Sequence, residues 1–386
     1  MTHPERTTGR PVYCIDLSPA AHERAGLGRY AASLARALLQ LGVTVSAFVN
    51  DPAESHLSPP LSELPVITVG LRRKTWRLRV ALSYAGGPSM DRVFDGVRVF
   101  HATDHLLPKL TRARTVFTLH DTAYLQFPQY HLPRNRAFLR VMMPRFLRRA
   151  DRIIAVSEAT RRDAVRLYDL DPAKIDVIYE GVEERFRPDV DAADVARVRE
   201  RYRLPERFVL SMSTIEPRKN LTTLLGAYRA LRDRHPAIGL VIAGGKGWMY
   251  EGFFERLRAL GLDREVVLPG YVPDADVPAL LNAADLFAFP SEYEGFGLPP
   301  LEAMACGVPV VSSDAASLPE VVGDGGLLVP AKDERAWVEA IDRLLSDQQL
   351  RSELRRKGPA RARGFTWAET ARRTLEAYRA ATGKQG

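Results

Sequence analysis

The sequence predicts an α/β fold of two domains, each a parallel sheet with helices on both faces. Two observations support this prediction. Short β-rich segments alternate with longer helical segments nearly throughout the chain, a pattern typical of parallel sheets flanked by helices rather than of a sandwich or a bundle. The length of 386 residues also exceeds what one hydrophobic core usually supports, so we expect two domains of similar size.

The first unit of this alternation is the clearest. A strand is expected over residues 12–17, a glycine turn over 25–28, a helix over 29–40 that Gly42 closes, and the next strand over 43–49. The later strands of this domain are predicted at residues 97–101, 115–119, 152–156 and 177–178.

The linker between the domains is placed in residues 179–188, which are rich in charge and end on a proline. Just before it, Ser157 suits the N-cap of a helix over Glu158–Tyr168. The second domain then repeats the rhythm, with strands at 208–211, 239–243, 266–268, 285–290 and 308–312 and helices from 221 and at 277–284, 299–306, 336–345 and 367–381. The predicted division is therefore 1–188, 189–365 and a C-terminal helix within 366–386 that packs back toward the first domain.

Composition narrows the class of protein. No apolar run approaches the roughly 20 residues that a membrane span requires, and the polar N-terminus lacks the apolar core of a signal peptide, which predicts a cytoplasmic protein. Cys14 and Cys306 form neither a disulfide framework nor a metal-ligand pair, so we expect both to be buried small hydrophobes.

The net charge of +8 is concentrated in the first half of the chain. Residues 1–190 contain 28 Lys and Arg against 20 Asp and Glu, whereas the remainder has 27 of each. Two clusters carry the excess: Arg72, Arg73, Lys74, Arg77 and Arg79 around Trp76, and Arg134, Arg136, Arg140, Arg145, Arg148 and Arg149. The second cluster suits an anionic membrane surface or an anionic acceptor, or is simply a solvated helix face. Neither cluster belongs to a nucleic-acid-binding motif, so no nucleic-acid partner is predicted.

The segment 285–314 is the most informative for chemistry. In it a strand leads through a loop into a helix and another strand, and ligands of open α/β sheets bind where strands end and helices begin. Gly295 and Gly297 allow the backbone to approach a ligand closely. Glu294 and Glu302 offer carboxylates for the hydroxyls of a sugar or ribose, although a capping acid and a solvated acid would give the same pattern.

The same segment closely resembles the signature of family 4 retaining glycosyltransferases. The resemblance extends through SMSTIEPRKN (211–220), LVIAGGKG (240–247), PGYVPDADVPALLNAAD (269–285), GLGRY (26–30), TLHD (118–121) and IIAVSEATRRD (153–163), which span most of the chain in the family's order. It implies the GT-B architecture, in which two Rossmann-like domains face each other across a cleft. The stretch HDTAYLQFPQY is most similar to bacterial polysaccharide mannosyltransferases.

The resemblance implies where a nucleotide-sugar donor binds. Lys219, with Arg218 as a weaker candidate, would neutralise the diphosphate, since charge builds on this group as the glycosidic bond breaks. An arginine that the family often has a few residues earlier is replaced here by Ser213 and Thr214. The remaining donor contacts would be Glu294 with the amides of Gly295, Phe296 and Gly297 on the sugar side, Glu302 on the ribose diol, and Tyr271 and Val272 beside the base.

From the first domain, the resemblance implies that Gly26 and Gly28 approach the diphosphate and that His120 faces the transferred sugar. His120, Lys219 and Glu294 are then the residues closest to the chemistry. Read alone, a Gly-x-Gly pair is a weak signal, and a histidine at a strand end is as often structural as catalytic. Asp121 either shares the function of His120 or caps the following turn.

The predicted reaction transfers a hexose, with GDP-mannose as the favoured donor, to a glycan or lipid-linked acceptor. The resemblance implies front-face displacement with retention. No Asp-x-Asp motif stands at a strand end, so no metal and no cofactor are expected, and Lys219, Arg218 and helix amides would stabilise the diphosphate instead.

Three alternatives remain open at this stage. A dinucleotide oxidoreductase would explain Gly26 and Gly28 with Asp51 as the ribose acid, but nothing after residue 190. A nucleotide-sugar epimerase would share the architecture while needing no acceptor. The third alternative is a non-catalytic protein that binds a sugar or a membrane.

Overall fold

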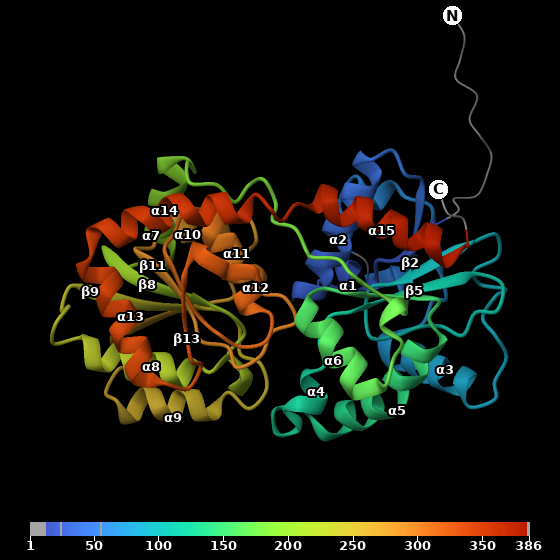
Figure 1. Ribbon diagram of the computed structural model, residues 1–386, viewed down its shortest axis with the longest axis horizontal. Helices are drawn as coiled ribbons and strands as arrows, with labels where there is room; N and C mark the ends of the chain where they lie inside the picture. The colour runs from blue at the N-terminus through green and yellow to red at the C-terminus, as the bar shows by residue number, and fades with distance from the viewer. Residues whose placement is uncertain (1–12, 24, 55, 384–386) are drawn as a thin grey trace, which may run out of the picture.

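The computed structural model describes residues 13–23, 25–54 and 56–383. The polar N-terminus and the first residue of the strand expected over 12–17 lie outside the described residues. Figure 1 shows two α/β units side by side, and every strand pair within them is parallel. The predicted fold class is confirmed.

The first unit contains a seven-stranded sheet in the order β3-β2-β1-β4-β5-β6-β7. Its strands are β1 (Tyr13–Asp16), β2 (Val45–Val49), β3 (Val66–Thr68), β4 (Val99–Ala102), β5 (Arg114–Leu119), β6 (Arg152–Ala155) and β7 (Ile175–Val177). Its α-helices are α1 (Ser18–Ala21), α2 (Ala25–Gln40), α3 (Arg73–Tyr84), α4 (Ala123–Gln126), α5 (Pro133–Arg149) and α6 (Glu158–Tyr168). The strand order doubles back at β1 and β4, which is where open α/β sheets bind ligands.

The second unit contains a six-stranded sheet in the order β10-β9-β8-β11-β12-β13. Its strands are β8 (Arg207–Met212), β9 (Ile238–Ala243), β10 (Val266–Gly270), β11 (Leu286–Phe289), β12 (Val310–Ser313) and β13 (Leu327–Val329). Its helices are α7 (Ala192–Tyr202), α8 (Leu221–Leu231), α9 (Glu251–Ala259), α10 (Val277–Ala283), α11 (Leu298–Ala305), α12 (Leu318–Val322), α13 (Glu334–Ser346) and α14 (Gln348–Ala362).

The chain crosses back to the first unit at its end. Figure 1 shows α14 over the second unit and α15 (Trp367–Ala381) over the first, where α15 packs against α2, β5 and β6. Thr366 caps α15 by accepting the amide of Glu369. Buried Tyr378 fixes the helix through a 2.8 Å hydrogen bond with Nδ1 of His101, whose Nε2 lies 2.7 Å from the hydroxyl of Thr118.

Local signals explain most helix boundaries. Ser157 caps α6 as predicted, because its hydroxyl accepts the amide of Thr160 at 3.0 Å. The glycine turn expected over 25–28 is wrong, since α2 begins at Ala25 and includes both glycines. The backbone of Gly28 has no positive φ, and a Cβ there would lie 2.7 Å from the carbonyl oxygen of Pro19, so this glycine allows α2 to pack on α1.

Among the described residues, no helix is long and apolar enough to cross a membrane. Cys14 and Cys306 are free thiols and are buried, as expected, and burial raises the pKa of the Cys14 thiol to about 12.

Candidate functional site

A cavity of about 880 Å³ lies between the two sheets, and both units contribute to its walls. The N-terminal wall is the first turns of α2, and the C-terminal wall combines the ends of β8 and β9, the loop after β10 and the start of α11. Five of the predicted site residues line it: Gly26, Gly28, Tyr271, Val272 and Glu302.

The glycines of the cavity wall do different things. A Cβ on Gly26 would meet nothing within 4 Å, so this position is open toward the cavity. Gly244 follows β9 with a φ of 148°, and a Cβ there would lie 1.9 Å from the carbonyl oxygen of Ser213. Gly244 therefore allows the segments that follow β8 and β9 to lie close together, and the first turn of α2, whose N-terminus favours anions, lines the other side of the cavity.

The rim and wall near β10 suit a planar group. The side chain of Tyr271 is 71% exposed at the cavity, whereas neighbouring Val272 is 6% exposed. An exposed tyrosine ring beside a buried aliphatic residue offers the apolar surface that a nucleobase requires.

Glu302 is the buried acid of the cavity. It is 1% exposed, and its Oε1 pairs with Nη1 of Arg29 from α2, while Nη2 of Arg29 lies 2.8 Å from Asp274. Its Oε2 is buried without a hydrogen-bond partner among the described residues, as is the hydroxyl of Ser213 in the same cavity. Burial raises the pKa of Glu302 to about 7, although Arg29 opposes this shift. The free oxygen can therefore accept a ligand hydroxyl.

Glu294 belongs to a compact ionic cluster beside the cavity. Lys219 donates to its Oε1 at 2.6 Å and Arg218 to its Oε2 at 3.1 Å. Burial alone would raise the pKa of Glu294, but the two cations hold it at about 2. Arg218 also pairs with Glu216 and donates to the carbonyl oxygen of Tyr293. Lys219, Arg218 and Glu294 thus lie together as predicted from the sequence, yet none of them lines the 880 Å³ cavity.

The turn that carries Lys219 is fixed by hydrogen bonds from the side chain of the next residue, Asn220. Asn220 adopts the left-handed conformation with a φ of 52°, and its amide donates to the carbonyl oxygens of Pro290 and Ala331. These bonds connect the turn to the ends of β11 and β13, which keeps Lys219 close to the loop of Glu294.

The loop 295–297 is a contact between the two units. A Cβ on Gly295 would lie 1.7 Å from the carbonyl oxygen of His120, and Thr160 donates to the carbonyl oxygen of Gly295 at 3.2 Å. Phe296 is 4% exposed, and Gly297, with a φ of 117°, precedes α11. These three residues do not line the cavity. Glycine at 295 is required for close approach of the first unit.

His120 lies at the end of β5 and does not line the cavity either. Its Nε2 faces the carbonyl oxygen of Thr103 at 3.0 Å, and its Nδ1 lies 3.7 Å from Glu180. The edge of its ring meets Tyr30. Both ring nitrogens therefore face protein atoms. Asp121 accepts the amide of Ala123 at 3.0 Å, which is the capping alternative considered above.

The residues at this site that sequence reasoning did not single out include Arg29, Glu180 and Asp274. Arg29 and Asp274 lie within the quoted blocks GLGRY and PGYVPDAD, so their position inside these blocks was the available signal. Nothing in the sequence marks Glu180, which lies in the linker and is 5% exposed. Asp51, the acid of the oxidoreductase alternative, accepts the amide of Ala53.

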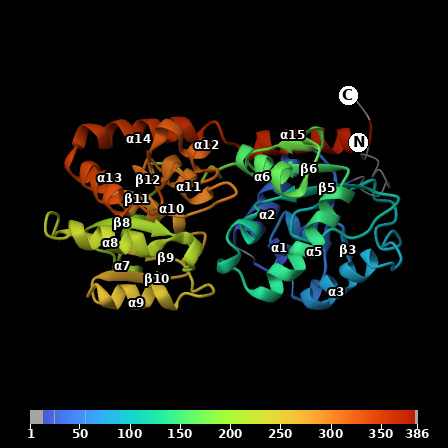
Figure 2. The same ribbon diagram turned by 60° about the horizontal axis from the view of Figure 1, so that its bottom comes forward.

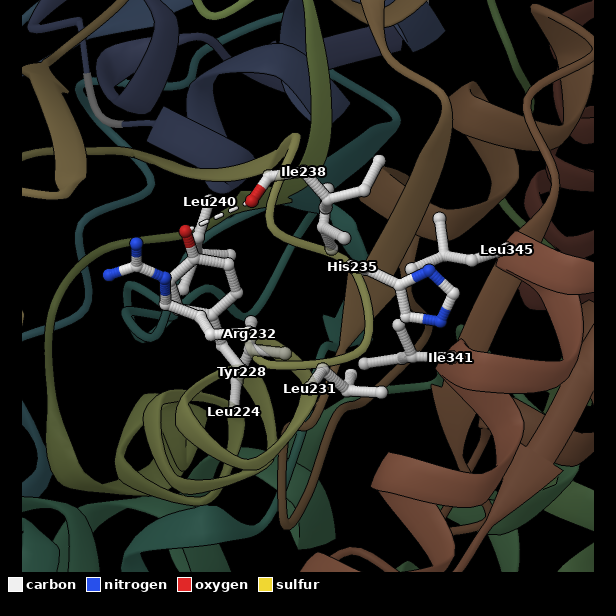
Figure 3. A pocket seen from close by; sticks show the side chains of 10 residues that line it. Leu224, Tyr228, Leu231, Arg232, His235, Ile238, Leu240, Ile341 and Leu345 are labelled. Carbon is white, nitrogen blue, oxygen red and sulfur yellow. Dashed lines mark hydrogen bonds between the residues drawn. The ribbon is translucent and has the colours of Figure 1, made fainter.

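A second cavity is too small to bind a substrate. Figure 3 shows it in the second unit, lined mainly by apolar side chains from α8 and α13 with Arg232 and His235 at its edge. Tyr228 donates there to the carbonyl oxygen of Ile238. Its volume of about 10 Å³ holds one water molecule at most.

No group of three or more His, Cys, Asp and Glu side chains in the described part of the chain could hold a metal ion. The metal-free reaction stays a prediction.

Comparison with known proteins identifies the class. Residues 194–361 match the family Glycosyl transferases group 1, and residues 24–186 match Glycosyltransferase Family 4. The O-antigen chain mannosyltransferase B of Escherichia coli is 35% identical over 315 residues, which cover 80% of this chain and 77% of that protein. The serotype-specific mannosyltransferase WbdA of Escherichia coli is 32% identical over 273 residues, 69% of this chain but 33% of that longer protein.

Solved structures agree on the fold. HepE from Anabaena, in complex with UDP-glucose, superposes with a TM-score of 0.72 at 20% identity and covers 95% of this chain and 99% of its own. Three findings lead to one conclusion. The structure has two parallel-sheet units with a cavity between them, the sequence has the blocks around Lys219 and Glu294, and a relative matches over most of both lengths. The chain belongs to the family 4 glycosyltransferases of GT-B architecture.

Proposed function

We propose that the protein is a retaining hexosyltransferase that uses a nucleotide-diphosphate sugar, with GDP-mannose as its donor. The observation that carries the proposal is the Lys219–Glu294 pair, which lies close in sequence to Thr214 and Leu298 of the cavity wall. The same cavity contains buried Glu302, whose Oε2 has no partner among the described residues. A cation that stabilises a leaving diphosphate and an acceptor for hydroxyls are the two groups that such a donor needs.

The donor proposal is supported by the chemistry of the walls. The exposed ring of Tyr271 suits a base, Oε2 of Glu302 and the hydroxyl of Ser213 suit ribose or sugar hydroxyls, and the N-terminus of α2 suits phosphate. Mannose is favoured because two relatives are named mannosyltransferases. A bound UDP-glucose in HepE supports a nucleotide sugar in general.

Lys219 is proposed to act in the bond-breaking step. The C–O bond between the sugar and the diphosphate breaks, the diphosphate takes the electron pair, and Lys219 stabilises the new charge. The acceptor oxygen attacks from the same face, so the configuration at the anomeric carbon is retained. Its proton passes to the departing phosphate, and no metal is required.

The acceptor is proposed to be a glycan or a lipid-linked glycan that meets the first unit at an anionic membrane. The α3–α5 face, which we define as the exposed surface of these two helices, carries this proposal. Figures 1 and 2 both show α3 and α5 next to each other, and Arg77 of α3 joins them by donating to Asn135 and lying over the ring of Phe138. Neither helix contains an acidic residue.

Apolar and basic side chains share this face. Leu78 and Leu82 lie one turn apart on α3 and are 59% and 57% exposed, and Val141 of α5 is 52% exposed. The same two helices carry exposed basic residues: Lys74, Arg79, Arg134, Arg140, Arg145 and Arg148. None of these six has a carboxylate partner among the described residues. Exposed leucines together with basic residues that have no carboxylate partner are typical of helices that lie on anionic lipid.

A donor screen in excess EDTA tests the proposed reaction. A nucleotide sugar at 100 times its dissociation constant stabilises the folded protein by about 2.7 kcal/mol, which thermal unfolding detects. We expect the largest shift with GDP-mannose and a smaller one with UDP-glucose. NMR of the transferred product should then show the anomeric configuration of the donor. Stabilisation by none of the nucleotide sugars, or activity that EDTA abolishes and magnesium restores, would contradict the proposal.

Vesicle binding tests the acceptor side. Each basic side chain near an anionic leaflet contributes about 1 kcal/mol, so replacing Arg140, Arg145 and Arg148 by Gln should weaken binding to phosphatidylserine vesicles by about 100-fold at low salt. Donor affinity should not change. The matched control replaces three exposed arginines of the second unit, Arg258, Arg264 and Arg363. If both triple variants bind vesicles equally, the α3–α5 face is only a solvated surface.

A further inference from the structure

We propose that Arg29 of the first unit binds the donor diphosphate, and that it exchanges its ion pairs with Glu302 and Asp274 for the phosphates when the donor binds. The inference rests on the proposed nucleotide-diphosphate donor and adds to it a residue that no other observation assigns. It concerns affinity for the diphosphate and the coupling of that affinity to Glu302.

The distribution of cations around the cavity leads to this proposal. Among the residues that the structure describes, its charged lining consists of three arginines and four acids: Arg29, Arg36 and Arg185, and Glu23, Glu183, Asp274 and Glu302. Ser213 and Thr214 line the opposite wall without charge, and Lys219 and Arg218 lie outside the lining, bound to Glu294. These arginines are therefore the cations of the described lining that a diphosphate can contact, in addition to Lys219.

Arg29 is the arginine in the right place. It follows Gly28 in the first turns of α2. Its side chain therefore starts near the helix N-terminus, where backbone amides also favour phosphate. Its side chain is 18% exposed and already reaches across the cavity. Arg36 lies seven residues later on the same helix, about 10 Å further along the axis. Arg185 is held by Glu183 and by the carbonyl oxygen of Asp274.

Glu302 is the residue that allows Arg29 to exchange its ion pair for a contact with phosphate. One of its oxygens pairs with Arg29 and the other has no partner among the described residues. A nucleotide that gives hydroxyl donors to Glu302 replaces part of what Arg29 supplies, so the guanidinium can turn toward the phosphates without leaving a buried carboxylate unsatisfied. Asp274, with 54% of its side chain exposed, is a weak second anchor that water can replace.

The Arg29–Glu302 ion pair bridges the two units. A donor that replaces this pair therefore contacts both units at once. Arg29 belongs to the first unit and Glu302 to the second. A nucleotide monophosphate engages Glu302 but offers little to Arg29, whereas a diphosphate engages both. The second phosphate should therefore add affinity that depends on Arg29.

The experiment compares GDP with GMP by calorimetric titration, and UDP with UMP as a second pair, on the full chain in EDTA. The quantity of interest is the ratio of the monophosphate to the diphosphate dissociation constant. We expect Arg29→Gln to lower this ratio at least tenfold and Arg29→Lys to restore part of it, because a hydrogen bond to a charged group contributes affinity of this order. The control Arg36→Gln should change it less than threefold. Thermal unfolding establishes that each variant is folded.

The outcomes separate this inference from the proposed function. If Arg29→Gln binds both nucleotides more tightly with an unchanged ratio, Arg29 only competes for Glu302, and the assignment to the diphosphate is overturned. An equal fall of the ratio in Arg36→Gln would also overturn it, because the effect would be general charge. If the wild-type protein binds neither diphosphate, the proposed donor class itself fails.

Discussion

Two glutamates eight positions apart, Glu294 and Glu302, occupy opposite electrostatic environments. Both are largely buried, with side chains 13% and 2% exposed. Glu294 has a pKa held at about 2, whereas that of Glu302 is raised to about 7. The difference follows from the number of cations around each carboxylate and from where those cations come.

The two cations that pair with Glu294 belong to the same unit as Glu294. Lys219 and Arg218 lie in the short helical turn Pro217–Lys219 that follows β8, and Asn220 fixes this turn. Glu302 instead pairs with Arg29 from the opposite unit, and its other oxygen has no partner in the described part of the chain. The first region is therefore fixed by ion pairs within one unit, whereas the ion pair of Glu302 depends on the other unit.

The largest expected effect comes from the Glu294 region. Replacing Lys219 by Ala should lower turnover by about 10² to 10³, the usual loss when one contact to developing charge is removed. Because Arg218 remains beside Glu294, the chain should stay folded. Steady-state assay with GDP-mannose measures the loss.

A second variant separates chemistry from stability in that region. Lys219→Ala leaves a carboxylate with one cation instead of two, so some stability is lost as well. Adding Glu294→Gln removes the uncompensated charge and should restore stability without restoring turnover. If turnover returns together with stability, Lys219 acts through folding and not on the leaving group.

The next effect concerns pH and the Glu302 region. A raised pKa means that the folded state holds this proton more tightly than the unfolded state, so the contribution to stability is fully present below pH 4.5 and is lost as pH rises through about 7. The difference in unfolding free energy between wild type and Glu302→Gln should therefore fall by up to about 3 kcal/mol from pH 4.5 to pH 8. Urea titrations at several pH values measure it. A constant difference would mean that Glu302 is not desolvated.

The smallest effect is expected at Asp274, the exposed partner of Arg29. An ion pair with a half-exposed carboxylate contributes about 0 to 1 kcal/mol, so Asp274→Asn should change the unfolding free energy by less than about 1 kcal/mol. A loss as large as that of Arg29→Ala would show that Asp274, and not Glu302, is the main anchor of Arg29.

The same comparison shows what the sequence could predict. Elements with strong local signals were anticipated closely: α6 with its Ser157 cap and α15 at Trp367–Ala381 agree with their predicted ranges. The three-residue strand β13 was missed because it is too short for periodicity. The helix α14 was missed because it contains Gly358 and Pro359, residues that usually end a helix, and Gly358 is there for close packing on Met304.

Site residues divide in the same way. Lys219, Arg218 and Glu294 lie in two short blocks of one domain, so their proximity was predictable. The pairing of Arg29 with Glu302 joins residues 273 positions apart in sequence, and no local pattern encodes it. The roles of Gly28 and Gly295 were also out of reach, because the carbonyl oxygens that exclude a Cβ at these positions come from other segments.

The central claim is that the Glu294 region serves the chemical step and the Glu302 region serves donor binding. Steady-state kinetics of Lys219→Ala and Glu302→Gln with the same donor, each under saturating acceptor, test it most directly. We predict that Lys219→Ala lowers kcat by at least 100-fold, while Glu302→Gln raises the donor KM about tenfold and leaves kcat within threefold. A loss of kcat in Glu302→Gln equal to that in Lys219→Ala, or a change of KM alone in Lys219→Ala, would contradict the claim.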